Sequence, residues 1–130
     1  MKVLQQLEKV HINFNEDTNA IELIWQKPQD PESYKQAFIM GHDYLVEHKA
    51  TNWLSDIRLQ GVVGPASSKW LQEEMIPKAV ANGLRRIAVI MDQDAFKKFY
   101  INNIKKEADS NKIQLRYFDS TEEANMWLKS

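Results

Sequence analysis

An uninterrupted apolar run, Ile87-Ala88-Val89-Ile90-Met91, is the feature that most constrains how this chain folds. A strand with one face in water alternates apolar and polar residues, so a run without polar residues indicates a strand buried on both faces. Such strands lie inside parallel sheets, because the helices that connect parallel strands cover both faces of the sheet. We therefore predict a central strand of a parallel sheet over residues 86–91.

The first part of the chain predicts an antiparallel hairpin. In residues 10–15, Val10, Ile12 and Phe14 alternate with polar residues, which is typical of a half-buried strand. Residues 16–19 form a polar turn cluster, and residues 20–26 alternate in the same way. Two alternating segments joined by a short polar turn form a hairpin.

Helix and strand signals alternate after the hairpin. Asp30 and Pro31 suit the start of a helix that runs to about residue 49, and a strand follows over 52–57. Residues 58–64 form a loop, and a second helix opens at Pro65 and closes at residues 82–83, with Gly83 in the left-handed conformation. Pro77 should kink this helix or end its first half near Met75.

A third helix is predicted from about Gln93 to residue 108, with an inward face of Phe96, Phe99, Tyr100 and Ile104. A fifth strand over 113–118 and a last helix, capped by a box that begins at Ser120, complete the order ββαβαβαβα. We predict one α/β domain over residues 1–130, with a five-stranded mixed sheet and four helices.

Composition excludes several classes of function. The chain has 130 residues, 17 basic and 18 acidic side chains and a net charge of −1, without the basic stripe that nucleic-acid binding requires. It has no cysteine, which excludes disulfides and thiol catalysis and fits a reducing compartment. We expect a cytoplasmic protein, because no signal peptide precedes the domain and no run reaches the roughly 18 apolar residues of a membrane span.

The chain resembles the STAS/SpoIIAA-like group, and more its less characterised bacterial members than the sporulation regulators. The resemblance is carried by the hairpin, by residues 53–58, by Trp70-Leu71 and Pro77 on the second helix, by Gly83, and by residues 123–128. It implies a non-enzymatic regulatory or protein-binding domain, such as a signalling antagonist or scaffold. In the sporulation-type members a serine at the start of the second helix is phosphorylated. The matching residues here are Ser67 and Ser68, although the group's Asp-Ser-Ser-Gly pattern is not reproduced.

The candidate binding site lies where the third strand runs into the second helix. Asp56 stands at the carboxyl end of a strand, where open α/β sheets bind ligands. Its simpler interpretation is a local ion pair or cap, with Arg58 as the partner. Ser67 and Ser68 stand in the first turn of a helix, which favours negative charge. The candidate site residues are therefore Asp56, Arg58, Ser67, Ser68 and Trp70.

The sequence carries no recognisable catalytic, metal or cofactor motif. His11, His42 and His48 are scattered and fit surface or helix-end positions, and Gly61 and Gly64 do not have phosphate-loop spacing. We expect no cofactor and a protein partner, with a small apolar or amphipathic ligand as the alternative and a homodimer as the default assembly. An enzyme that uses Asp56 as an acid or base ranks last.

Overall fold

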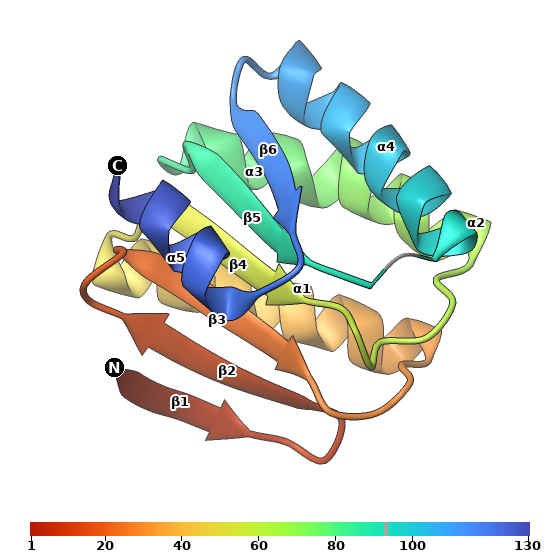
Figure 1. The fold of residues 1–130 in the computed structure, drawn as a ribbon, viewed down its shortest axis with the longest axis horizontal. Coiled ribbons are helices and arrows are strands. Elements are labelled where there is room, and N and C mark those ends of the chain that lie inside the picture. Colours follow the sequence, from red (N-terminus) through yellow and green to blue (C-terminus); the bar gives the residue numbers. More distant parts are fainter. Residues whose placement is uncertain (93) are drawn as a thin grey trace.

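The structure is a computed structural model that describes residues 1–92 and 94–130, and its six strands form one sheet in chain order (Figure 1). The sheet is antiparallel from β1 to β3 and parallel from β3 to β6. Its strands are β1 (Lys2–Gln6), β2 (Val10–Asn15), β3 (Ala20–Trp25), β4 (Asn52–Asp56), β5 (Arg86–Ile90) and β6 (Gln114–Phe118). The predicted mixed α/β architecture is confirmed, but the predicted number of five strands was wrong.

The strand missing from the prediction is β1, which pairs with β2 at the edge of the sheet. Its register shifts between Val3 and Gln5, as in a β-bulge. An extra residue breaks the alternation of side chains between the two faces, and that alternation is the signal by which a strand is found in a sequence. The element order therefore begins with three strands rather than two.

Four helices cover the sheet in the described part of the chain, as predicted. They are α1 (Pro31–His48), the continuous helix formed by α2 (Pro65–Trp70), η1 (Leu71–Met75) and α3 (Ile76–Ala81), then α4 (Ala95–Ser110) and α5 (Thr121–Lys129). The predicted first residue of the third helix, Gln93, lies outside the described residues. Asp30 caps α1 through a capping box with Ser33, and Ser120 accepts a hydrogen bond from the Glu123 amide at the start of α5.

The second helix changes its winding where Pro77 stands. A proline has no amide hydrogen and its ring crowds the preceding turn, so an α-helix rarely continues through it unchanged. Here η1 is a π-helical turn: the Ile76 amide donates to the Leu71 carbonyl, and α3 begins one residue before Pro77. The predicted effect of Pro77 thus takes the form of a change of winding at Leu71–Met75, and the helix does not end there. Gly83, with a φ of 108°, follows the helix end.

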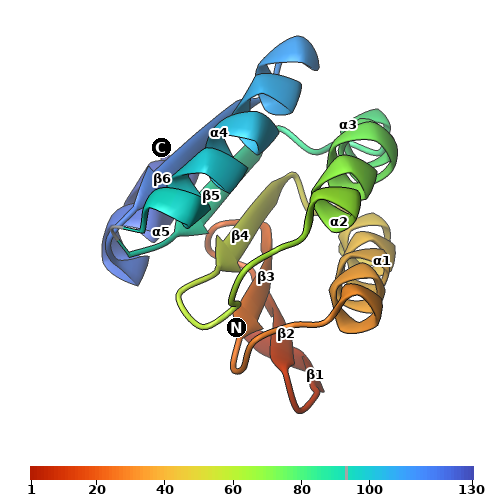
Figure 2. The same cartoon turned by 90° about the vertical axis from the view of Figure 1, so that its right-hand side faces the viewer.

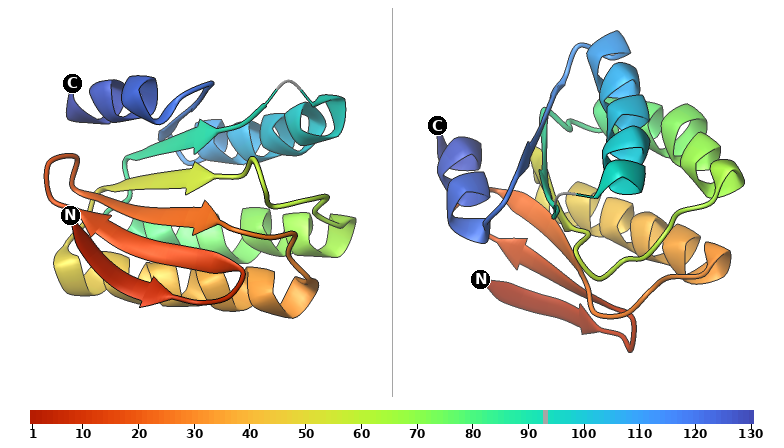
Figure 3. Two further views of the ribbon diagram at one scale, coloured as in Figure 1. Left: turned by 60° about the horizontal axis from the view of Figure 1, so that its bottom comes forward. Right: turned by 45° about the vertical axis from the view of Figure 1, so that its right-hand side comes forward.

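The helices divide unequally between the two faces of the sheet. Figures 2 and 3 show α1, α2–α3 and α4 on one face and α5 alone on the other. Along β5, Ile87 and Val89 belong to the larger core under the three helices, whereas Ala88 and Ile90 pack in the smaller cluster that includes α5 residues. The strand lies between parallel neighbours β4 and β6, so its predicted burial on both faces is confirmed.

One histidine prediction was wrong. His42 was expected at the surface, but it is 4% exposed, and its Nε2 lies 3.0 Å from the Nδ2 of Asn82. The contact joins α1 to the end of α3. Burial, and then the nearby charge of Lys78, lower the pKa of His42, so the neutral ring is the form that the fold accommodates.

Candidate functional site

A groove of about 650 Å³ lies at the carboxyl ends of the parallel strands. Three connections meet there: the one from β3 to α1, the one from β4 to α2, and the start of α4 after β5. In an open α/β sheet this edge is the usual place for a ligand, because the connecting loops diverge from one another there. Lining residues come from segments 26–28, 58–65, 68–72 and 94–103.

Hydrogen bonds and a close packing contact join two of the loops whose residues line the groove. The Gln29 amide donates to the Gln60 carbonyl at 2.9 Å, and the Gln29 side chain donates to the Val62 carbonyl at 2.7 Å. Gly61 has a φ of 79° and packs against Pro28, where an added Cβ would lie 3.0 Å from the proline Cβ. Only glycine adopts this backbone conformation without strain, so the close approach of the loops depends on Gly61.

Asp56 and Arg58 form the ion pair that the simpler interpretation of the sequence predicted. Asp56 is the last residue of β4, and its Oδ2 accepts from Arg58 Nη2 at 2.6 Å while its Oδ1 accepts from Arg58 Nε at 3.0 Å. Hydrogen bonding to the carboxylate raises the pKa of Arg58. The Asp56 side chain is only 10% exposed, whereas that of Arg58 is 46% exposed and lines the groove.

A second set of polar contacts attaches α4 to the β4–α2 loop. Lys97 Nζ donates to the Arg58 carbonyl at 2.9 Å and to Asp92 Oδ1 at 3.0 Å. The hydrogen bond from Lys97 lowers the pKa of Asp92. Asp94 caps α4, because its Oδ1 accepts from the amides of Phe96 and Lys97. These contacts hold the first turn of α4 beside the loop that carries Arg58.

The two serines and Trp70 lie in different surroundings. Ser67 is 4% exposed and faces the core, whereas Ser68 lines the groove, and its Oγ accepts from Gln72 Nε2 at 2.9 Å. Trp70 is half-buried and packs edge-on against Tyr34 and Phe38 of α1, with ring centroids 6.3 and 6.5 Å away. The structure therefore brings Arg58 and Ser68 into the groove, and it places Ser67 and Trp70 outside the lining.

Two phenylalanines that were predicted to face the core are instead exposed at the groove. Phe96 is 75% exposed and Phe99 is 71% exposed, and both line the groove from the first two turns of α4. Ile101 and Ile104 form the buried side of that helix. At about 100° per residue, Phe99 lies roughly 160° around the helix from Ile101 and roughly 140° from Ile104. The helical spacing of the sequence therefore already indicated that Phe99 faces away from the core.

Below the groove lies a second, much smaller space. It is an apolar cavity of about 50 Å³ between the sheet and the helices, and Gln60 and Tyr100 line both spaces. The hydroxyl groups of Tyr100 and Tyr34 share a hydrogen bond, and burial raises the pKa of both phenols. Gln60 is 1% exposed, and its Nε2 has no hydrogen-bond partner among the described residues.

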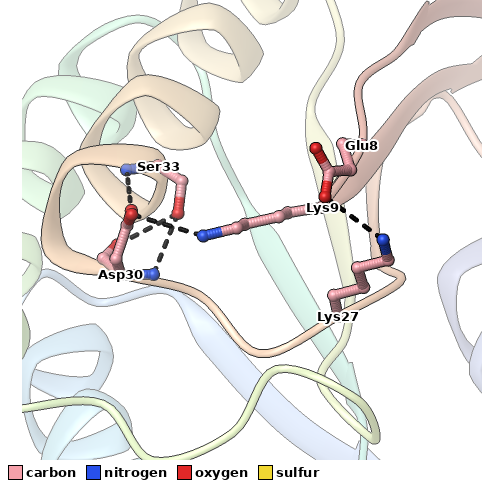
Figure 4. Close-up of polar contacts among 5 residues, drawn as sticks. All are labelled: Glu8, Lys9, Lys27, Asp30 and Ser33. Carbon is pink, nitrogen blue, oxygen red and sulfur yellow. Dashed lines mark hydrogen bonds and ion pairs between the residues drawn. The ribbon is translucent and has the colours of Figure 1, made fainter.

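Two ion pairs connect the hairpin to the segment that carries the groove residue Lys27 (Figure 4). Lys27, which lines the groove, pairs with Glu8 at 3.2 Å, and Lys9 pairs with Asp30 at 3.3 Å. Hydrogen bonds from Ser33, together with Lys9, lower the pKa of Asp30 to about 2. Both ion pairs join the β1–β2 turn to the β3–α1 connection, so the turn of the antiparallel hairpin supports the connection that carries Lys27.

The carboxylates of Asp56 and Asp94 are both hydrogen-bonded within the chain. In residues 1–92 and 94–130, no group of three His, Asp or Glu side chains is placed to hold a metal ion. Asp56 is hydrogen-bonded to Arg58 through both of its oxygens, and Asp94 is hydrogen-bonded to helix amides. The arrangement presents apolar surface and hydrogen-bond donors, which suits binding better than acid–base chemistry.

No helix in the described part of the chain is long and apolar enough to span a membrane.

Comparison with known proteins gives one match. A family model described as SpoIIAA-like matches residues 20–129, which include the groove and every element from β3 to α5. No curated protein and no solved structure matches the chain.

Proposed function

Because the chain belongs to the SpoIIAA-like family, we propose that it is a non-enzymatic regulatory domain that binds another protein at the groove. The observation that carries the proposal is the exposure of Leu59, Val62, Phe96 and Phe99 in one place. These side chains are 57%, 76%, 75% and 71% exposed and line a single groove. Exposed aromatic and aliphatic groups that gather around a concave surface, with polar groups at its edge, are typical of protein interfaces.

Ser68 is the serine at which we propose control of this binding by phosphorylation. It lines the groove, whereas the hydroxyl-bearing side chain of Ser67 is buried. A phosphate on Ser68 would place about two negative charges among the groove residues. Ser68→Glu mimics part of that charge, and we expect it to change partner recovery, with Ser68→Ala as the control.

The direct test is site-specific photo-crosslinking in the native host. A photoreactive phenylalanine analogue at Phe99 should crosslink to a discrete partner protein. The same analogue at Met126, which is 72% exposed on α5, should not crosslink to that partner. Recovery of the partner should fall with Phe99→Ser and persist with Met126→Ser. Equal crosslinking from both positions, or recovery that ignores Phe99→Ser, would contradict the proposed surface.

Trp70 tests how far the surface extends. Because Trp70 packs on α1 and does not line the groove, Trp70→Ala should affect the partner only if the interface continues from the groove toward α1. Circular dichroism and a melting curve separate loss of contact from loss of fold.

We also propose a cytoplasmic homodimer, and light scattering of the purified protein measures the assembly.

A second candidate is a carrier of a small amphipathic ligand, and the groove volume favours it. About 650 Å³ lies within the range of small-molecule sites, whereas the 50 Å³ cavity has room for only a few water molecules. A carried ligand would therefore sit in the groove. Native mass spectrometry of protein purified without detergent should then show a bound mass that Phe99→Ser removes, and a clean mass of the bare chain would count against this candidate.

A further inference from the structure

The exposed apolar groups at the groove point to an occupant of protein size. Four of the ten large apolar side chains that are exposed in the described residues line this one groove. Each is more than half exposed, so much of its surface faces away from the groove interior. A small molecule inside the groove would leave that surface in water, whereas a chain segment laid across the groove would cover it.

The polar lining is rich in hydrogen-bond donors and basic groups. Among the described residues it includes four basic side chains and a single carboxylate, that of Asp94, although the whole chain has a net charge of −1. Asp94 accepts hydrogen bonds from two amides of α4. The four basic residues are Lys27, Arg58, Lys69 and Lys97.

Ion pairs behind the groove balance part of this charge but leave donors free. Lys27, Arg58 and Lys97 pair with carboxylates that do not line the groove, those of Glu8, Asp56 and Asp92. An ammonium has three donors and a guanidinium has five, so these pairs do not use them all. Lys69 has no carboxylate within 4.0 Å in the described part of the chain.

Gln60, which lines both the groove and the smaller cavity, carries a buried donor that has no acceptor in the described part of the chain. Gln60 Nε2 is one of three buried polar side-chain atoms without a partner among the described residues, and it alone belongs to a residue that lines the groove. An unpartnered buried amide group is costly because it has lost its hydrogen bonds to water, so such groups are uncommon in folded proteins. A carboxylate or carbonyl oxygen of an occupant would supply the missing acceptor if the Gln60 side chain turns toward the groove.

We propose that the groove binds an acidic, amphipathic segment of a partner protein, and this inference rests on the proposed function. Aliphatic or aromatic side chains of the segment pack on Phe96, Phe99 and Val62. Carboxylates of the segment face Lys69 and Arg58, and one of its oxygens accepts from Gln60 Nε2. The partner is thus identified by its chemistry: apolar residues interspersed with Asp or Glu.

Two matched pools of synthetic peptides test the proposal with the full chain. The peptides of both pools are about twelve residues long and carry Leu, Phe and Val at the apolar positions. At the other positions, one pool carries Glu and Ser, and the other carries Lys and Ser. Fluorescence polarisation should show at least about tenfold tighter binding of the acidic pool, and rising salt should weaken that binding. Nitrogen-15 NMR shifts should map the bound peptides to the groove.

Variants with matched controls locate the contacts. Phe99→Ser and Lys69→Glu should each weaken the acidic pool by about tenfold. Met126→Ser removes an equally exposed apolar group elsewhere, and Lys106→Glu makes the same change of charge on α4 outside the groove lining, so both should bind like the wild type. Gln60→Leu keeps a similar volume without the donor and should weaken binding while leaving the melting temperature unchanged or higher.

Three outcomes would overturn the inference: equal or tighter binding of the basic pool, binding that ignores Phe99→Ser, and no binding of either pool. A small molecule that copurifies with the wild type and is lost from Phe99→Ser would assign the groove to a different occupant and would also overturn it. If position 99 crosslinks a partner in cells while the peptide pools fail, only the acidic segment is wrong. If position 99 crosslinks nothing, the proposed function fails as well.

Discussion

Gly61 is the residue whose replacement most directly tests how the groove is built. It has a φ of 79° in the loop between β4 and α2, and it packs on Pro28 of the neighbouring connection. Gly61→Ala adds one methyl group at a point where the backbone conformation and the space both oppose it. The substitution should therefore destabilise the protein and displace the loop that carries Arg58 and Gln60.

The size of the effect follows from three terms. A residue with a Cβ in a left-handed conformation costs about 1–2 kcal/mol. The 3.0 Å approach to the Pro28 Cβ is closer than the optimal carbon–carbon separation of about 3.5–4.0 Å, which adds up to about 1 kcal/mol. Alanine restricts the unfolded chain more than glycine does, which offsets about 0.4–1 kcal/mol. The net loss of unfolding free energy is about 1–2 kcal/mol.

Urea unfolding and thermal melting measure this loss. For 130 residues the unfolding entropy is about 0.27 kcal/mol per degree, so the melting temperature should fall by about 4–7 °C. Gly64→Ser is the matched control in the same loop, because Gly64 has open space around it and a φ of −70° at a helix N-cap, where serine is favoured. If Gly61→Ala melts with the wild type, the close packing of the two loops is wrong.

Four further substitutions test the fold at the site and around it. Phe99→Ser should change the unfolding free energy by less than about 0.5 kcal/mol because the ring is exposed, whereas Ile104→Ala should cost about 2–5 kcal/mol, as denaturant titrations will show. The lowered pKa of His42 means that the unfolded state binds its proton more readily than the folded state does. The contribution of His42 to the unfolding free energy is therefore fully present above pH 6.5 and falls at lower pH. In His42→Gln, the unfolding free energy should depend less on pH below 6.5. The pKa of Asp30 is lowered from 3.8 to about 2, so its contribution to stability is present above pH 3.8 and is lost as the pH falls through about 2. In thermal melts from about pH 5 to 2, Asp30→Ala should therefore lose less stability with falling pH than the wild type does. An unchanged pH dependence would contradict the capping box.

The parts of the fold that the sequence predicted are those with a local signal. The strand β2 matches the predicted 10–15 because its side chains alternate without interruption, and β5 lies inside the parallel sheet because five successive apolar residues require cover on both faces. The edge strand β1 escaped the prediction because its bulge interrupts the alternation. His42 was misplaced for a different reason: its burial depends on Asn82, which is 40 residues away in the chain.

The geometry of the candidate site was predicted in part, and the predicted part again consists of contacts between residues close together in the chain. Asp56 and Arg58 are two residues apart, so their ion pair is a local event that the sequence suggests. Ser67 stands four residues before Leu71, so its burial follows from helical spacing alone. Phe99 was assigned to the core because aromatic residues are usually buried, although its phase opposed that of Ile104. The unpartnered Gln60 had no sequence signal, since the groove that it lines is built from segments far apart in the chain.

The two edges of the parallel sheet differ in a way that favours the carboxyl edge as the binding surface. At the amino edge, Asn52 is buried, and its side chain donates to the Thr18 carbonyl at 2.7 Å, while the Arg85 amide donates to the Thr51 carbonyl at 2.7 Å. These contacts close that edge with the chain's own polar groups. At the carboxyl edge, Gln60 Nε2 is buried without a partner beside exposed aromatic rings. Unsatisfied donors and exposed apolar groups both carry a free-energy cost in isolation, so their occurrence together at one edge is best explained by an occupant that relieves both.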